Sequence, residues 1–265
     1  MSKVWFITGS SRGLGRTLAE AVLAAGHQLV ASARNPKQLD DLVQRYGQQI
    51  RPVALDVSDA DAATKAVQTA IDAFGRIDVV VNNAGYPWVG PLHEMADEQW
   101  QAMLDCHLTA PFQLLRATAD VLLELAKKEK DNGGAQSRKV VNVSSVAGTR
   151  GLAGAANYAA AKAGLVGLTK SLAREWAPYN IQANAVAFGQ IATRLTGPVE
   201  DGLKIQRKDT EIPLGIPSHG RKVWSEMHPM GRPGTVHEAA GVILFFASPL
   251  SNYVSGQVLE VTGGI

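Results

Sequence analysis

The sequence has few of the features that mark secreted or membrane proteins. It contains one cysteine, Cys106, so no disulfide can form within the chain. No apolar run approaches the roughly 20 residues that a helix needs to span a bilayer. The N-terminal stretch MSKVWFITGSS lacks the apolar core and small-residue cleavage site of a secretion signal. We therefore expect a cytoplasmic protein that does not contact a membrane.

An excess of one charge is also missing. Lys and Arg total 26, Asp and Glu total 24, and the net charge is +2 at pH 7. This balance argues against a nucleic acid as the main partner. The six histidines show no ligand spacing such as H-x-x-x-H, so we predict no metal site.

Short apolar runs alternate with longer amphipathic stretches along the chain. In the first such stretch, Leu14, Leu18 and Val22 share one face at helical spacing. Alternating strands and helices predict right-handed crossovers and a parallel sheet covered by helices on both faces. The expected strands are residues 4–8, 28–32, 51–54, 79–82, 139–143, 181–186 and 258–261.

Residues 194–230 interrupt this alternation with repeated glycines and prolines. A long irregular stretch inside a compact domain is usually a functional lid or a mobile loop. We expect this segment to close over a substrate. The residues that could form its apolar underside are Ile212, Leu214, Ile216, Trp224, Met227 and Met230.

The first expected strand leads into a glycine-rich turn, TGSSRGLG, at residues 8–15. Gly9, Gly13 and Gly15 place no side chain between the backbone and a ligand. The helix that follows offers free N–H groups and positive potential at its N-terminus. A glycine turn between a strand and a helix predicts a site for the pyrophosphate of a dinucleotide.

The end of the second expected strand indicates which dinucleotide binds. An acidic residue there would hold the adenosine ribose 2′-hydroxyl of NAD. This chain instead has Ala31-Ser32-Ala33-Arg34, without a carboxylate. Arg34 and Arg12 could both form charge-assisted bonds to a 2′-phosphate. We predict NADP(H) over NAD(H); the alternative is that both arginines are solvated surface charges.

Tyr158 and Lys162 are candidates for acid–base chemistry. They lie four residues apart in NYAAAKAG (157–164) and so share one face of a helix. A free tyrosine, with a pKa near 10, exchanges protons poorly at neutral pH. A lysine ammonium favours the phenolate, so we expect Lys162 to lower the pKa of Tyr158 and make the phenol a usable proton donor or acceptor.

Several motifs occur in one order along the chain: TGSSRGLG, NNAG (82–85), Ser145 thirteen residues before Tyr158, YAAAK and NAVAFGQIAT (184–193). With these motifs the chain resembles the short-chain dehydrogenase/reductase family over essentially its whole length. It is most similar to the branch of 3-oxoacyl carrier-protein reductases and related carbonyl reductases. The resemblance implies a single NAD(P)-binding domain, residues 1–265, with a Rossmann-like three-layer α/β/α fold and a seven-stranded parallel sheet. It also implies a homotetramer, formed through two long helices near 97–127 and 157–176.

The resemblance assigns roles to individual residues. Ser145 would hold the substrate oxygen, Tyr158 would donate the proton in a reduction, and Lys162 would bond the nicotinamide ribose. The NNAG stretch would support the central strand and the cofactor. With the glycine turn and the two arginines, the expected cofactor-binding residues are Gly9, Ser11, Arg12, Gly13, Leu14, Gly15, Arg34, Asp56, Val57, Asn83, Ala84, Gly85, Tyr158, Lys162, Gly189, Ile191 and Thr193.

Two positions depart from the family pattern. Phe188-Gly189 stands where Pro-Gly is usual, which could loosen the turn or add an aromatic wall beside the nicotinamide. His107, in DCHLTAPF (105–112), stands where asparagine is usual. Neighbours on a helix point about 100° apart, so Cys106 and His107 do not form a nucleophilic pair. Cys106 is most simply a small buried side chain.

Pro111 makes the stretch around His107 informative. Proline has no N–H, so the carbonyl of His107 loses its helical partner, and the helix should kink. In the family, the carbonyl at this position binds a water in a proton relay through the active-site lysine. We expect this water to persist and the imidazole to replace the structural hydrogen bonds of the asparagine. The predicted catalytic set is therefore Ser145, Tyr158, Lys162 and His107.

Apolar and aromatic residues occupy the positions that match the substrate pocket, which suits a bulky apolar or aromatic ketone or the matching alcohol. They could equally be ordinary core and lid packing. A 3-oxoacyl carrier-protein thioester is the alternative substrate, although residues 194–230 carry six basic against five acidic residues and so show no strong basic excess. An NADP-binding sensor or structural protein is an alternative of another class. The expected substrate-contacting residues are Tyr86, Trp88, Leu152, Phe188 and Gln190.

Overall fold

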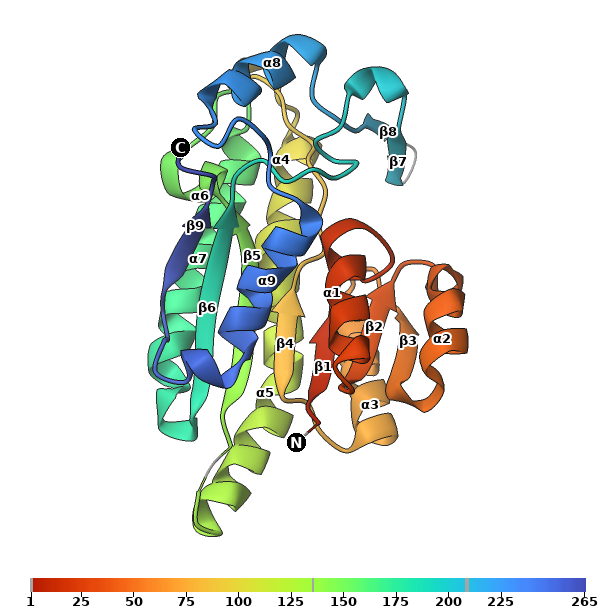
Figure 1. The fold of residues 1–265 in the computed structure, drawn as a ribbon, viewed down its shortest axis with the longest axis vertical. Helices are drawn as coiled ribbons and strands as arrows, with labels where there is room; N and C mark the ends of the chain where they lie inside the picture. Colours follow the sequence, from red (N-terminus) through yellow and green to blue (C-terminus); the bar gives the residue numbers. More distant parts are fainter. Residues whose placement is uncertain (1, 135, 208–209) are drawn as a thin grey trace.

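The computed structural model describes residues 2–134, 136–207 and 210–265 (Figure 1). A seven-stranded sheet with the order β3-β2-β1-β4-β5-β6-β9 runs through it, and every neighbouring pair is parallel. The predicted Rossmann-like fold with a seven-stranded parallel sheet is therefore confirmed. The strands are β1 (Val4–Ile7), β2 (Gln28–Ala33), β3 (Ile50–Ala54), β4 (Val79–Asn82), β5 (Arg138–Ser145), β6 (Ile181–Phe188) and β9 (Val258–Val261).

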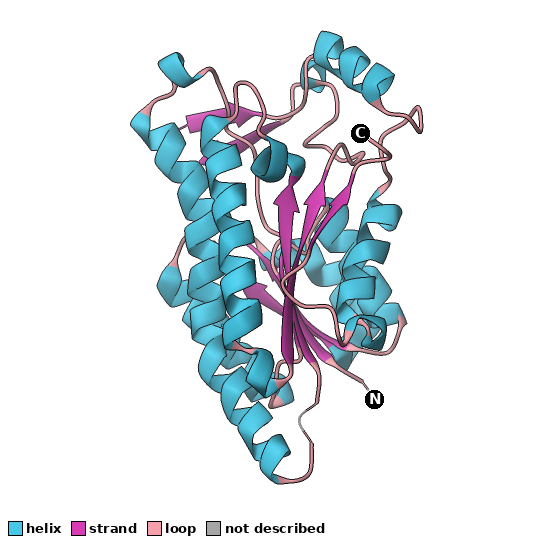
Figure 2. Cartoon of the chain, turned by 90° about the vertical axis from the view of Figure 1, so that its left-hand side faces the viewer, coloured by secondary structure: helices cyan, strands magenta, loops and turns pink. Residues whose placement is uncertain are grey.

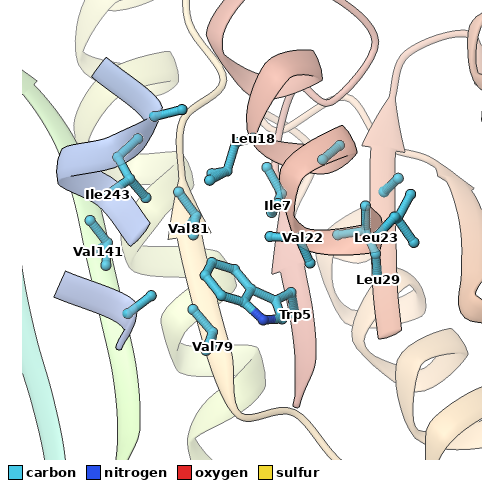
Figure 3. Close-up of a cluster of buried hydrophobic side chains, with 14 of the residues drawn as sticks. Trp5, Ile7, Leu18, Val22, Leu23, Leu29, Val79, Val81, Val141 and Ile243 are labelled. Atoms are coloured by element: carbon cyan, nitrogen blue, oxygen red, sulfur yellow. The ribbon is translucent and has the colours of Figure 1, made fainter. Parts of the chain in front are cut away.

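Helices cover both faces of this sheet, as Figure 2 shows with the sheet nearly edge-on. Side chains alternate between the faces along a strand: Trp5 and Ile7 of β1 belong to one buried cluster (Figure 3), and Phe6 belongs to the other. The first cluster includes residues of α1 (Gly13–Ala24), α2 (Asp40–Tyr46) and α9 (Val236–Ala247). The second includes residues of α3 (Ala60–Phe74), α5 (Ala110–Asp131) and α7 (Ala156–Glu175).

Parallel strands send the segments that follow them out of the sheet at the same edge. The glycine turn follows β1, the NNAG stretch begins at the last residue of β4, and β5 and β6 end at Ser145 and Phe188. Strands β5 and β6 each run two residues beyond the end expected from the sequence. The predicted site residues therefore converge on the carboxyl edge of the sheet.

Residues 194–230 are more regular than we expected. They contain a hairpin of β7 (Lys204–Arg207) and β8 (Thr210–Pro213), followed by α8 (Ser218–Met227). The expectation of an irregular stretch is wrong because Ile205 and Ile212 pair across this hairpin and pack beneath it with Leu214. Of the expected underside, Ile212 and Leu214 are buried, Ile216 is partly buried, and Met230 is 63% exposed. The side chains of Trp224 and Met227 lie outside the described part of the chain.

The first of the two expected long helices is interrupted. It consists of α4 (Asp97–Leu104), a π-helical turn over Asp105–Thr109 and α5, with the N–H of Ala110 donating to the carbonyl of Asp105. The π turn ends two residues before Pro111, where the missing N–H prevents a regular helical bond. The second expected helix corresponds to α7. No helix among the described residues is long and apolar enough to cross a membrane.

Candidate active site

The backbone between β1 and α1 forms an open cradle. Arg12 is the N-cap of α1, its side chain makes no capping bond, and the first turn of the helix carries no acidic residue. A Cβ built on Gly13, whose φ is +53°, would meet nothing within 4 Å. The first N–H groups of α1 therefore face open space, as a phosphate site requires.

Gly15 allows a close contact within the protein. A Cβ at this position would lie 2.2 Å from the carbonyl oxygen of Gly9 and 2.5 Å from Nδ2 of Asn83. Nδ2 of Asn83 donates to the carbonyl of Thr8 at 2.9 Å. The N–H groups of Asn83 and Ala84 each donate to Oγ1 of Thr8 at 2.9 Å. The NNAG stretch thus connects the end of β4 to the glycine turn.

Three arginines that line the cavity, Arg12, Arg34 and Arg194, lie close enough to affect one another electrostatically. Nη2 of Arg12 donates to Oε1 of Gln38 at 2.8 Å, and Nη1 of Arg34 donates to the carbonyl of Gln206 at 3.1 Å. Burial, followed by the charges of Arg12 and Arg34, lowers the pKa of Arg194. The salt bridges within the described residues include none of these three arginines. Their positive charge is therefore available to an anion.

Tyr158 and Lys162 lie on one face of α7, as their spacing predicts. Nζ of Lys162 donates to the carbonyl of Val143 at 2.7 Å and lies 5.7 Å from the centre of the Tyr158 ring. Burial lowers the pKa of Lys162 to about 8. Burial also raises the pKa of Tyr158 to about 12, against the opposing effect of a hydrogen bond with Ser145. The net shift of the Tyr158 pKa is therefore upward, opposite to the direction we expected from Lys162, because burial dominates. The phenol keeps its proton at neutral pH, which is the form that a proton donor needs.

Ser145 ends β5 and caps α6 (Val146–Arg150). Its Oγ accepts a hydrogen bond from the N–H of Ala147 at 3.2 Å. Gly148, which sequence reasoning missed, lets α6 pack directly on α7: a Cβ there would lie 2.6 Å from the carbonyl carbon of Lys162. The available signal for this contact was the run of small residues in SSVAG at 144–148.

His107 is buried between the NNAG stretch and α7. Its Nε2 lies 2.8 Å from the carbonyl oxygen of Tyr86. A carbonyl only accepts, so Nε2 carries the proton, and Nδ1 is a buried acceptor that no described residue satisfies. Burial, and then the charge of Lys162, lowers the pKa of His107, so the ring is neutral. The ring meets that of Tyr158 edge to face at 4.9 Å.

The geometry around His107 explains a neighbouring glycine and excludes a nucleophilic pair. A Cβ on Gly85 would lie 2.4 Å from Cε1 of His107, so no larger residue fits beside this imidazole. Cys106 is buried as expected, and burial raises the pKa of its thiol to about 11. A protonated thiol beside a neutral imidazole has neither the thiolate nor the base that such a pair needs.

Every residue predicted for the site lines a single cavity of about 1000 Å³. Of the expected substrate residues, Tyr86 and Trp88 pack against Ile205 and Ile212 of the hairpin. Phe188 and Gln190 are buried, while Leu152 is 43% exposed. Buried Phe188 belongs to the core cluster beside α9 as well as to the cavity wall.

The cavity also has lining residues that sequence reasoning missed, and some of them lie on the hairpin. Ile205, Gln206 and Arg207 all line it. The alternating runs KIQR and TEIP on either side of a polar pair were the available signal for two short strands. Among the described residues, no three His, Cys, Asp or Glu side chains are placed to hold a metal.

Known proteins with the same arrangement identify the family. A family model described as enoyl-(acyl carrier protein) reductase matches residues 9–265. The chain belongs to the short-chain dehydrogenase/reductase family. It is therefore an oxidoreductase that acts on CH–OH or carbonyl groups with a nicotinamide cofactor. This result sets aside the alternative of a binding protein without catalysis.

Three similar proteins are named as 3-oxoacyl or 3-ketoacyl carrier-protein reductases. The 3-oxoacyl-(acyl-carrier-protein) reductase of Vibrio cholerae is 35% identical over 263 residues, which cover 99% of this chain and 97% of the relative. The enzyme of the same name from Thermotoga maritima is 35% identical over 266 residues, with the same coverage. The crystal structure of 3-ketoacyl-(acyl-carrier-protein) reductase from Brucella melitensis, complexed with NADH, has a TM-score of 0.83 and 25% identity, covering 99% of this chain and 97% of that one.

Proposed function

We propose that this enzyme reduces the 3-oxo group of an acyl thioester to a 3-hydroxyl group, with NADPH as the preferred cofactor. The observation that carries the proposal is the placement of Ser145, Tyr158 and Lys162 in one cavity with an open phosphate cradle, in a chain about 35% identical to 3-oxoacyl reductases over nearly their whole length. This reverses the order of the sequence-based hypotheses, which placed a bulky ketone first.

The chain's residues account for the proton and charge steps. A bound nicotinamide dinucleotide supplies a hydride to the carbonyl carbon. Tyr158 donates its proton to the carbonyl oxygen, and Ser145 holds that oxygen by a hydrogen bond. The developing phenolate lies near the ammonium of Lys162, which stabilises it. Hydride and proton together convert the carbonyl to an alcohol.

The glycine cradle and the arginines support the cofactor assignment. The uncapped N-terminus of α1 suits a pyrophosphate, and Arg12, Arg34 and Arg194 supply positive charge where NAD-specific enzymes carry a carboxylate. The remaining predicted cofactor residues lie along the same cavity. This proposal also includes a preference for NADPH, assembly into a homotetramer, a cytoplasmic location and a lid role for residues 194–230.

A bulky aromatic ketone is the second candidate substrate. The packing of Tyr86 and Trp88 against Ile205, Ile212 and Leu214 favours it, because this apolar wall suits a large apolar group. Two earlier expectations remain predictions. One is that Phe188 forms an aromatic wall beside the nicotinamide, and the other is that the carbonyl of His107 binds a relay water.

A direct comparison of substrates tests the proposal. The kcat/KM for NADPH-dependent reduction of a 3-oxobutanoyl thioester of N-acetylcysteamine is measured beside that for an aryl alkyl ketone. We expect the thioester to be preferred at least tenfold, roughly the effect of one hydrogen bond to a charged group. A preference for the aryl ketone would support the second candidate.

A further inference from the structure

Arg207, the last residue of β7, extends from the hairpin into the active-site cavity. Its Nη1 donates a hydrogen bond to the hydroxyl of Tyr86 at 2.8 Å. Both residues line the cavity that holds the predicted catalytic set. Neither the sequence motifs nor the family resemblance assigns a function to this arginine.

The surroundings of Arg207 are apolar. Ile205, Ile212 and Leu214 form a buried cluster under the hairpin, and Tyr86, Trp88 and Leu195 pack against it. A guanidinium beside such a cluster loses much of its hydration. Unless other groups bond it, a partly buried cation in this position costs free energy.

The bonds made by Arg207 leave part of this cost uncompensated. Its Nε is buried, and no described residue accepts a bond from it. No carboxylate of the described residues forms a salt bridge with it. The hydroxyl of Tyr86 stays neutral at physiological pH, because burial raises its pKa to about 12. Among the described residues, the guanidinium therefore has a donor, Nε, without an acceptor, and no carboxylate within salt-bridge distance.

A short series of ring contacts connects Arg207 to the reacting end of the cavity. The Tyr86 ring lies 6.3 Å from that of His107, and the His107 ring lies 4.9 Å from that of Tyr158. Arg207 is thus connected to Tyr158, the proposed proton donor, through Tyr86 and then His107. A substrate oxygen that lies near the Tyr86 hydroxyl would therefore be within reach of this guanidinium.

We propose that Arg207 binds the thioester carbonyl oxygen of a 3-oxoacyl substrate, and so selects compounds that carry a second oxygen near the reacting carbonyl. This inference rests on the proposed function and deepens it. The lid hairpin then supplies a specificity-determining residue, while the sheet edge supplies the chemistry. A charge-assisted bond in a partly apolar cavity provides the selection.

Two substrates that differ by one oxygen test this role. One is the 3-oxobutanoyl thioester of N-acetylcysteamine; the other is the matching 3-oxobutyl thioether, in which a methylene replaces the thioester carbonyl. In Arg207→Met we expect kcat/KM for the thioester to fall about ten- to hundredfold, as for loss of a hydrogen bond to a charged group. Reduction of the thioether should stay within about twofold of wild type, which also shows that the variant is folded.

Lys204→Met is the matched control. Lys204 is an exposed cation on the same strand, paired with Glu211 and outside the cavity lining. This variant should leave both rates unchanged. Comparing the two substrates within each enzyme cancels their different intrinsic reactivities.

Failure of this inference differs from failure of the proposed function. Equal losses on both substrates in Arg207→Met, or no loss on either, would overturn the role of Arg207. A higher KM for NADPH with an unchanged substrate ratio would assign the arginine to the cofactor and overturn it as well. A wild-type enzyme that reduces the thioether but not the thioester would instead refute the proposed function.

Discussion

Two parts of the cavity wall are held in place by different amounts of structure. We call the carboxyl ends of the sheet strands together with α7 the floor, and the β7–β8 hairpin, for which we propose a closing role, the lid. On the floor, Ser145 ends a strand of the seven-stranded sheet, and the ammonium of Lys162 is bonded to Val143 of the same strand. The sheet beneath is buried by two large clusters. The lid hairpin has a buried cluster of three residues, Ile205, Ile212 and Leu214, and it contacts the floor through Arg34 and Tyr86.

This difference separates two tasks. Local opening of a protein begins where few apolar contacts are buried, so the hairpin should open at a lower free energy than the sheet edge. Proton transfer needs fixed geometry and belongs to the floor. Admitting and choosing a substrate needs movement, and in the proposed function it belongs to the hairpin that acts as a lid. Floor substitutions should therefore affect every substrate, while lid substitutions should affect some substrates more than others.

The largest effect is expected for Tyr158→Phe. Removing the phenolic hydroxyl deletes the proposed proton donor but keeps the ring that contacts His107. We expect kcat to fall about 10²- to 10⁴-fold for the thioester and for the ketone alike, since general acid catalysis contributes that much. Steady-state rates with NADPH check this. An unchanged rate would show that another group donates the proton, while a loss confined to one substrate would contradict the division between floor and lid.

Arg34→Met should give the next largest effect, because Arg34 belongs to the floor yet is bonded to the hairpin. Loss of a charge-assisted bond to a 2′-phosphate should lower kcat/KM for NADPH about ten- to hundredfold and leave that for NADH nearly unchanged. The ratio of the two values measures it. Arg45→Met, which removes an exposed arginine outside the cavity, is the control. Equal wild-type values for the two cofactors would refute the NADPH preference.

The floor could be predicted from the sequence because local patterns determine it. TGSSRGLG lies where a strand meets a helix, and Tyr158 and Lys162 are four residues apart on a helix, so short-range geometry places them. Parallel strands then bring the separate motifs to one edge of the sheet. All predicted residues accordingly line the same cavity.

Two properties of the site depend on long-range packing and were not predictable in this way. The pKa of Tyr158 is set by how deeply the phenol is buried, which the spacing to Lys162 does not reveal. The hairpin of residues 204–213 is stabilised by contacts with Tyr86 and Trp88, far away in the sequence. Arg207 therefore entered the site only through the folded structure.

Ile212→Ala should have the smallest effect and is the most direct measure of the difference between lid and floor. Ile212 is 1% exposed, but its cluster is small. We expect the hairpin to open more often, so that KM for the thioester rises a few-fold while kcat and the melting temperature change little. Ile243→Ala, on the face of α9 that belongs to the first large cluster, removes the same atoms from a site that is 0% exposed. That variant should lose about 2–5 kcal/mol of stability and melt several degrees lower.

Faster hydrogen exchange limited to residues 204–213 in Ile212→Ala would locate the opening in the hairpin. An equal fall in melting temperature for both variants would show that lid and floor unfold as one unit, and that the lid is no separate element of substrate choice.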